Sequence, residues 1–113
     1  MNVSVVGWKN TDECIAIVDQ IKDRIVIVAC ESIGDMAAAG YYYPDYQVTT
    51  SARYAIQHQE IDGVFFLDSN SEWITYAILS NKNVVVCNGW PRGYDRNTML
   101  AHRVGVRFTL WMS

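Results

Sequence analysis

Short apolar runs recur along the chain, and their composition predicts buried strands. The runs cover residues 3–6, 25–29, 64–67 and 84–86, are rich in β-branched and aromatic residues, and show no regular alternation with polar ones. Parallel strands that are covered on both faces are expected to look like this, because neither face meets water.

Segments with helical signals separate these runs. Thr11 and Asp12 can cap a first helix, whose expected apolar side follows the i, i+3, i+4, i+7 spacing at Cys14, Ile17, Val18 and Ile21. Further helices are predicted over residues 49–59 and 72–80, whereas residues 30–47 look irregular. Residues 104–112 predict a fifth strand, which can lie at the edge of the sheet.

The alternation of strands and helices predicts a single α/β domain over residues 1–113. We expect a three-layer flavodoxin- or Rossmann-like fold with a mostly parallel sheet of about five strands. Ligands of such sheets bind beyond the carboxyl ends of the strands. This rule selects residues 7–10, 30–45, 68–73 and 87–95 as candidate ligand-binding segments.

Composition narrows the classes of function. The 113 residues include nine basic and twelve acidic ones without a basic stripe, so we expect no nucleic-acid polymer as a partner. The three cysteines form no CxxC pair, which argues against a disulfide framework and a metal site and favours a reducing, cytoplasmic location. No apolar stretch approaches the length of a membrane span, so we expect no membrane partner.

The first candidate segment, "GWKNTDE", contains Gly7 as its only glycine. Neither the GxGxxG fingerprint nor a phosphate-binding P-loop is present, so no cofactor is expected. Gly7, Trp8 and Lys9 remain candidate ligand-binding residues. Lys9 could help a helix N-terminus near Thr11 to hold an anion, although Thr11 also fits a simple helix cap.

The second candidate segment is rich in tyrosine around Pro44. Tyr43, Asp45 and Tyr46 are candidates to stack on a base or sugar and to hydrogen-bond its rim. The alternative is a tyrosine-rich lid or a contact surface between subunits, where tyrosine is also frequent. Glu31 and Asp35 are either ligand-binding carboxylates or solvated loop charges.

The third candidate segment, "FLDSNSEW", follows a buried strand directly. Asp68 stands at the strand end, where functional side chains of this architecture lie, and Ser69 and Asn70 are candidate ligand-binding residues beside it. Glu72 is a candidate catalytic carboxylate, but Ser69 and Glu72 also fit a capping box at a helix N-terminus.

The fourth candidate segment concentrates aromatic and basic residues near a turn. Trp90 and Arg92 would suit a base or a phosphate, although protein interfaces favour the same residue types.

Three stretches resemble the nucleoside 2-deoxyribosyltransferase family of small flavodoxin-like enzymes. They are "EIDGVFFLDSN", "EWITYAILSNKNVVV" and "RNTML". The resemblance implies cleavage or exchange of an N-glycosidic bond, with Glu72 as nucleophile, Asp68 positioning the substrate, and Asn97 reaching a sugar hydroxyl or the glutamate, also across a subunit boundary.

Three functions therefore stay open. The chain is an enzyme of this type acting on a nucleoside or nucleotide, a non-catalytic module that senses or sequesters a nucleotide-like ligand, or a small oligomeric interaction protein. With half of its residues hydrophobic, we expect self-association in each case.

Overall fold

The computed structural model describes residues 1–111 and is built on a six-stranded sheet whose neighbouring strands are all parallel. The strands are β1 (Val3–Trp8), β2 (Ile25–Cys30), β3 (Gln47–Thr49), β4 (Gly63–Phe66), β5 (Asn83–Cys87) and β6 (Phe108–Trp111). The helices are α1 (Asp12–Ile21), a short 3₁₀ turn η1 (Lys22–Arg24), α2 (Ile33–Tyr42), α3 (Ala52–Gln57), α4 (Trp73–Leu79) and α5 (Tyr94–Val104).

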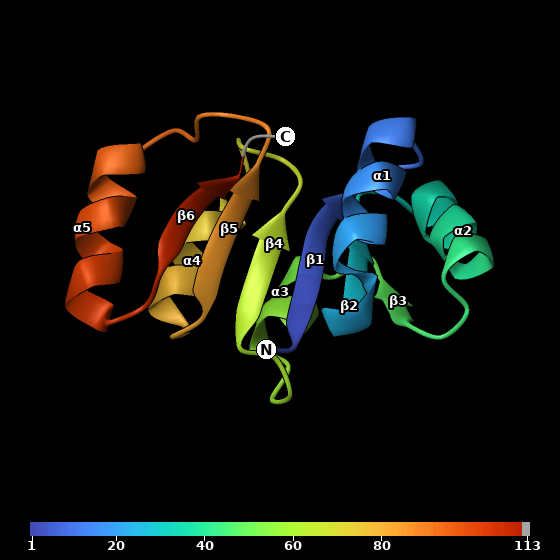
Figure 1. Cartoon of the computed structure of the whole chain (residues 1–113), viewed down its shortest axis with the longest axis horizontal. Coiled ribbons are helices and arrows are strands. Elements are labelled where there is room, and N and C mark those ends of the chain that lie inside the picture. Colours follow the sequence, from blue (N-terminus) through green and yellow to red (C-terminus); the bar gives the residue numbers. More distant parts are fainter. Residues whose placement is uncertain (112–113) are drawn as a thin grey trace.

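The strands lie in the order β3-β2-β1-β4-β5-β6 (Figure 1). This is the order of dinucleotide-binding Rossmann sheets and differs from the flavodoxin order 2-1-3-4-5. The predicted three-layer α/β fold is confirmed, and the sheet has one strand more than expected. The strand predicted over residues 104–112 begins only at Phe108 as the edge strand β6, and its last predicted residue, Met112, lies outside the described residues.

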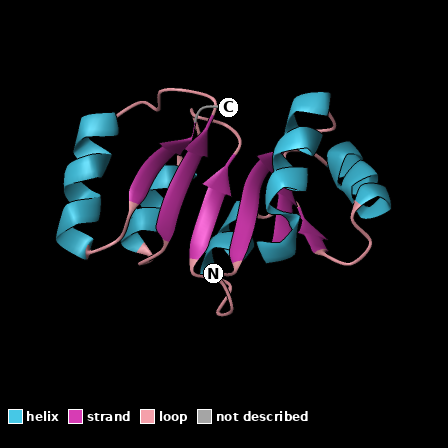
Figure 2. Ribbon diagram, in the orientation of Figure 1, coloured by secondary structure: helices cyan, strands magenta, loops and turns pink. Residues whose placement is uncertain are grey.

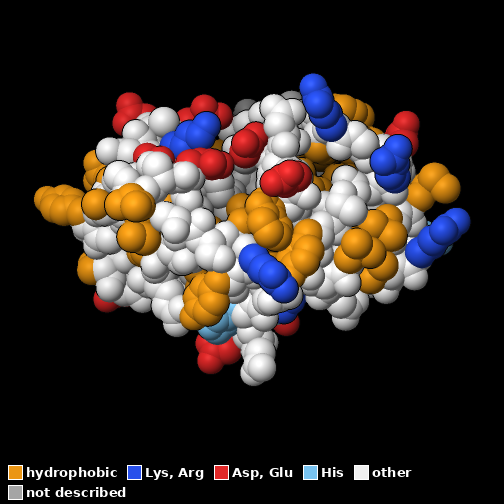
Figure 3. All heavy atoms as spheres, turned by 180° about the vertical axis from the view of Figure 1, so that it is seen from behind, with side chains coloured by type: hydrophobic (Ala, Val, Ile, Leu, Met, Phe, Trp, Pro, Cys, Tyr) orange, Lys and Arg blue, Asp and Glu red, His pale blue; other side chains and the backbone are white. Residues whose placement is uncertain are grey.

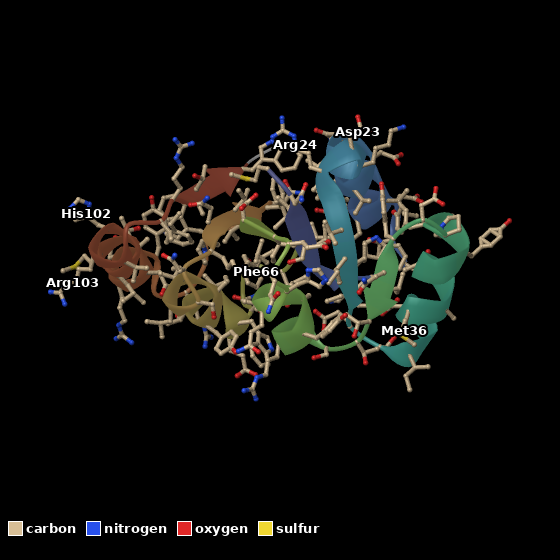
Figure 4. The ribbon with its side chains drawn as sticks, turned by 90° about the horizontal axis from the view of Figure 1, so that it is seen from below. Asp23, Arg24, Met36, Phe66, His102 and Arg103 are labelled. Atoms are coloured by element: carbon tan, nitrogen blue, oxygen red, sulfur yellow. The ribbon has the colours of Figure 1, made fainter. Side chains whose placement is uncertain are left out.

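Helices cover both faces of the sheet, as Figure 2 shows with α1 in front of the strands and α3 and α4 behind them. One core cluster, which includes Trp8, packs residues of β1 and β2 against α1 and α2. The other, which includes Phe66, lies against α3, α4 and α5, and Figure 4 shows Phe66 on the side of α3 and α4. Within residues 1–111, no helix is long and apolar enough to span a membrane.

Two helices and one strand were not predicted. Residues 30–47 are not an irregular loop, because Ser32 caps α2 by accepting a hydrogen bond from the Asp35 N–H, and β3 begins at Gln47. The Gly residues and the small Ala residues of α2 leave little apolar periodicity, so only Ala39 of this helix is fully buried. α5 begins at Tyr94, at the end of the fourth candidate segment, and ends before Gly105, which adopts a left-handed conformation.

Two predicted helix starts need correction. Thr49 belongs to β3, and α3 begins after Ser51, whose hydroxyl accepts a hydrogen bond from the Tyr54 N–H. The capping box of Ser69 and Glu72 is not formed, because Glu72 itself occupies the N-cap position of α4 and its side chain makes no capping hydrogen bond. The Ser71 hydroxyl accepts a hydrogen bond from the Trp73 N–H instead. The cap predicted for the first helix is confirmed by the hydrogen bond from the Cys14 N–H to the Thr11 hydroxyl.

Candidate ligand-binding site

The strand order reverses beside β1, and Gly7 marks this place. β1 pairs with β2 on one side and with β4 on the other, so the loops after these three strands meet at one edge of the sheet. Gly7 has a φ of +89°, and a Cβ atom built there would stand 3.4 Å from the Cβ of Asp68 and 3.4 Å from Oε1 of Glu31. Gly7 therefore brings together carboxylates from two different strand ends, as the rule for ligand sites in open sheets leads one to expect.

Two hollows open at this edge, on opposite faces of the sheet, and Gly7 lines both. The α3 hollow has a volume of about 370 Å³ and is lined by residues that include Glu31, Ser51, Arg53 and Trp73. The α1 hollow has a volume of about 310 Å³, and its lining includes Lys9, Cys14, Asp68, Ser69 and Asn88. A flat ring with a polar rim is of a size to enter either hollow, since ligand pockets begin at about 300 Å³.

Asp35 of α2 closes the loop between β1 and α1. Its Oδ1 accepts a hydrogen bond from the Asn10 N–H at 3.0 Å, and its Oδ2 accepts one from the Ser32 hydroxyl at 2.8 Å. The hydrogen bond from Asn10, then that from Ser32, and the nearby charge of Lys9 lower the pKa of Asp35 despite some desolvation. Asp35 is therefore a carboxylate at neutral pH and holds a backbone amide of this loop.

Asp68 orders its own loop. Its Oδ1 accepts a hydrogen bond from the Asn70 N–H at 2.9 Å, which is a local turn that aspartate commonly makes. Ser69 packs against the next loop so closely that a Cβ on Gly89 would lie 2.5 Å from its hydroxyl oxygen. The predicted ligand residues Asp68 and Ser69 thus lie at the edge of the sheet and line the α1 hollow, whereas Asn70 is exposed.

Thiol chemistry is disfavoured at this edge. Burial, followed by the charges of Asp35 and Glu31, raises the pKa of Cys30 to about 12. Burial likewise raises the pKa of Cys87 to about 12. Both thiols therefore stay protonated at neutral pH, and the thiolate is the nucleophilic form.

Acidic side chains dominate the rim of the site. Figure 3 shows Asp and Glu side chains gathered along the upper edge, where the strands of Figure 1 end. The acidic residues that follow these strand ends are Asp12, Glu13, Glu31, Asp35, Asp68, Glu72 and Asp95. Lys9 lines the α1 hollow and Arg53 the α3 hollow. No group of three or more His, Cys, Asp or Glu residues within 1–111 is arranged to bind a metal ion.

The tyrosine-rich stretch lies elsewhere. α2 carries the chain away from the carboxyl edge, so Tyr43, Asp45 and Tyr46 stand beside the end of α1, where the Tyr46 hydroxyl donates to the Lys22 carbonyl oxygen at 2.6 Å. Tyr43 is buried in the core cluster against α1 and α2. The prediction that this segment reaches the ligand edge is wrong, because it was based on an irregular loop where the chain forms a helix.

Trp8 is also a core residue rather than a surface residue. Its side chain is 0% exposed and packs edge-on against the Tyr43 ring, with ring centres 5.8 Å apart. Large buried aromatic side chains contribute to the core by their area. Trp8 is therefore part of the core next to the loop after β1, and its side chain lines neither hollow.

The remaining predicted residues lie outside the two hollows. Trp90 is 70% exposed and packs against Tyr94, and Arg92 is exposed beside it. Asn97 is 4% exposed, and its Oδ1 accepts a hydrogen bond from the Thr75 hydroxyl at 2.8 Å, which joins α5 to α4. Glu72 is exposed at the start of α4. The structure thus does not bring Glu72, Asp68 and Asn97 together into one hydrogen-bonded group among the described contacts.

Several residues of the two hollows were absent from the predicted site. Ser51 and Arg53 line the α3 hollow but were not predicted, because β3, which precedes them and brings them to this edge, was not predicted either. Cys14 was predicted as a core residue, and it also lines the α1 hollow. Glu31, which the sequence left open as either a ligand-binding carboxylate or a solvated loop charge, lines the α3 hollow.

Comparison with known proteins identifies the fold. No protein-family model matches the sequence, and no curated protein sequence matches it. Among solved structures, an NAD-binding protein from Listeria innocua superposes with a TM-score of 0.81 at 17% identity, over 96% of this chain and 34% of that one. A probable dehydrogenase from Thermotoga maritima gives a TM-score of 0.83 at 12% identity, over 97% and 35% of the two chains.

A third structure is a biliverdin reductase from Synechocystis in complex with biliverdin and NADP⁺. Its TM-score is 0.73 at 19% identity, over 96% of this chain and 37% of that one. The chain thus spans about a third of the length of these structures. At such identities the likeness shows a Rossmann-like α/β fold and leaves the function to the residues.

The resemblance to nucleoside 2-deoxyribosyltransferases is wrong. The similar structures are an NAD-binding protein, a reductase and a probable dehydrogenase with Rossmann-type folds, and the strand order of this chain is not that of a flavodoxin-like enzyme. The matching stretches share a pattern of buried strand, short loop and helix that any sheet of this class can contain. The roles assigned to Glu72, Asp68 and Asn97 through that resemblance are withdrawn with it.

Proposed function

We propose that this chain is a binding module for a small molecule that contains a nucleoside, held at the carboxyl edge around Gly7. The proposal is carried by one arrangement: Gly7, with its positive φ, lies at the point where strand order reverses, with Glu31 directly beside it. In dinucleotide-binding sheets a glycine forms the tight turn after β1, and an acidic residue about 20 residues further on accepts hydrogen bonds from a ribose. Gly7 and Glu31 suit these two tasks.

The NAD-binding and NADP-complexed proteins among the similar structures support a nucleotide-like ligand. The fit to a dinucleotide is partial, however. The second and third glycines of the fingerprint would fall on Lys9 and Asp12, counted from Gly7. A side chain at the second position prevents the backbone from approaching a pyrophosphate, and the third glycine serves close packing of helix and strand. Gly7 and Glu31 therefore support a site that binds the sugar without the ordinary glycine-rich loop for the phosphates.

Binding without turnover is the simplest reading of the chemistry at this edge. The thiol of Cys30 is held protonated, and Glu72 lies on the surface outside both hollows. We therefore expect a bound nucleoside or nucleotide to be recovered intact. The expected self-association of the chain stays a prediction.

Thermal unfolding of the full chain with and without ligands tests the proposal. A ligand at 100 times its Kd stabilises the folded state by about 2.7 kcal/mol, so saturating adenosine, guanosine, cytidine or uridine, or one of their monophosphates, should raise the Tm measurably. Chromatography of the recovered ligand should show no free base.

Glu31→Ala provides the matched test of the site. It should weaken the binding of the preferred ligand about tenfold or more, since a single hydrogen bond from a ribose hydroxyl to a charged acceptor is worth about 1.5–3 kcal/mol. Glu60→Ala, an exposed change on the turn before β4, serves as the control and should leave the affinity unchanged. A Tm that no nucleoside or nucleotide raises would overturn the proposal.

A further inference from the structure

The loop between β1 and α1 has already committed several of its backbone amides. The Asn10 N–H donates to Oδ1 of Asp35 at 3.0 Å, and the Thr11 N–H donates to the Lys9 carbonyl oxygen at 2.8 Å. The Cys14 N–H donates to the Thr11 hydroxyl at 3.2 Å. In phosphate-binding loops such amides point at the anion, together with the positive end of the helix dipole. Here the protein's own oxygen atoms have taken these donors.

Asp35 occupies the place of an anion in this loop. Its two carboxylate oxygens accept from one backbone N–H and one hydroxyl, which is the kind of donor set that a phosphate oxygen finds in such loops. Asp35 comes from α2, so the loop is closed by a neighbouring helix rather than by its own side chain. The hydrogen bonds from Asn10 and Ser32 keep it ionised at neutral pH, and its charge is therefore permanent there.

The charge around the loop also opposes a phosphate. Asp12 and Glu13 lie in the first turn of α1, and Glu31 follows β2 directly. Lys9 is the basic residue of the loop itself. Like charges close together disfavour one another, and a pyrophosphate placed at Gly7 would add negative charge among these carboxylates.

We infer that Asp35 makes this site select a nucleoside without a 5′-phosphate over nucleoside phosphates and dinucleotides. Asp35 acts as a built-in substitute for the phosphate, bound to the loop amide that a phosphate would otherwise use. This inference is based on the proposed function, because it presupposes that a nucleoside binds beside Gly7. It restricts the ligand to molecules whose sugar is free or carries an uncharged group at the 5′ position.

Isothermal titration of the full chain with adenosine, AMP, ADP and NAD⁺ tests the inference, with the corresponding series for the other bases. The wild-type chain should bind the best nucleoside at least tenfold more tightly than its diphosphate or the dinucleotide. A diphosphate or NAD⁺ that binds as tightly as the nucleoside would overturn the inference and leave the proposed function standing. Absence of binding throughout would overturn the proposed function itself.

Two substitutions separate the effects of Asp35. Asp35→Ala frees the Asn10 amide and removes the charge, and should raise the affinity for the diphosphate relative to that for the nucleoside at least fivefold. Asp35→Asn keeps an oxygen that accepts from Asn10 but removes the charge, so it should give only part of this gain.

Asp95→Ala is the matched control. Asp95 lies in the first turn of α5, as Asp35 lies in that of α2, and its removal should change neither affinity. Circular dichroism checks that α2 is intact in both Asp35 variants. A diphosphate affinity that neither Asp35 variant improves relative to the nucleoside affinity would contradict the inference.

Discussion

Two turns meet where the strand order reverses, and they are held in different ways. The turn after β1 is short, comes just after Gly7 with its positive φ near the end of the strand, and is closed by Asp35 of the neighbouring helix α2. The turn after β4 is longer and is closed by its own Asp68, which accepts from the Asn70 N–H. A turn that orders itself leaves a local signal in the sequence, whereas a turn that relies on a carboxylate 25 positions away does not.

The largest expected effect concerns the core side chains that pack next to the two turns, because their truncation should lower the free energy of unfolding by different amounts. Trp8 is fully buried under the first turn, while Leu67 is only half-buried under the second. Trp8→Ala should lower the free energy of unfolding by about 3–5 kcal/mol, because it removes a large core side chain and leaves a cavity. Leu67→Ala should cost less, and urea denaturation measures both. Equal losses would mean that the two turns are supported alike.

The second prediction concerns the backbone of the first turn. Gly7→Ala should cost about 1–2 kcal/mol, because residues with a Cβ avoid positive φ, although the space beside Gly7 would admit a methyl group with its nearest atoms at 3.4 Å.

Gly40→Ala is the control for that substitution. Gly40 lies in α2 with no atom within 4 Å of a Cβ, so the change should stabilise the protein by about 0.5–1 kcal/mol. If Gly7→Ala is as harmless as Gly40→Ala, the positive φ is not what this turn requires.

The smallest predicted effect is the contribution of Asp35 to the pH dependence of the free energy of unfolding. Because its pKa is lowered in the folded state, its stabilising effect is full above the unfolded value of about 3.9 and is lost as the pH falls through the lower folded value. The wild type and the Asp35→Asn variant differ in free energy of unfolding, and this difference should shrink as the pH is lowered through this range. Denaturation at a series of pH values measures this.

Ser32→Ala sharpens the same test. It removes the hydroxyl that donates to Oδ2 of Asp35 and so brings the folded-state pKa closer to the unfolded value. The acid-induced loss of stability should therefore be smaller, and complete at a higher pH, than in the wild type. A wild type and an Asp35→Asn variant with parallel pH profiles would show that the lowered pKa of Asp35 has no part in stability.

The strands were predictable because their signal is local. Runs such as residues 25–29 are apolar on both faces, and this pattern alone places them between two helix layers. α2 was not predictable in the same way, because Gly34, Gly40 and a run of alanines remove the apolar stripe. Its start was still marked by Ser32 and Asp35, a pair with the spacing of a capping motif.

The site was predictable where it depends on strand ends and not where it depends on topology. Asp68 and Gly7 were found because each directly follows an apolar run in the sequence. The omission of α2 also placed Tyr43 and Tyr46 at the wrong edge, since a helix of ten residues carries the chain about 15 Å back along the sheet. The role of Asp35 needs the packing of α2 beside the first loop, which no spacing in the sequence reveals.

The central place of β1 also governs how the chain must fold. β1 is synthesised before β2 and β3, yet it pairs with β4, in a register that joins Val3 to Gly63 and Val6 to Phe66. Two strands whose paired residues lie 60 positions apart in the sequence must therefore meet before the middle of the sheet is complete. Such distant pairings fold slowly, because the entropy of closing the loop is lost before the contacts form. Until β4 arrives, β1 presents an open edge that a second chain can pair with.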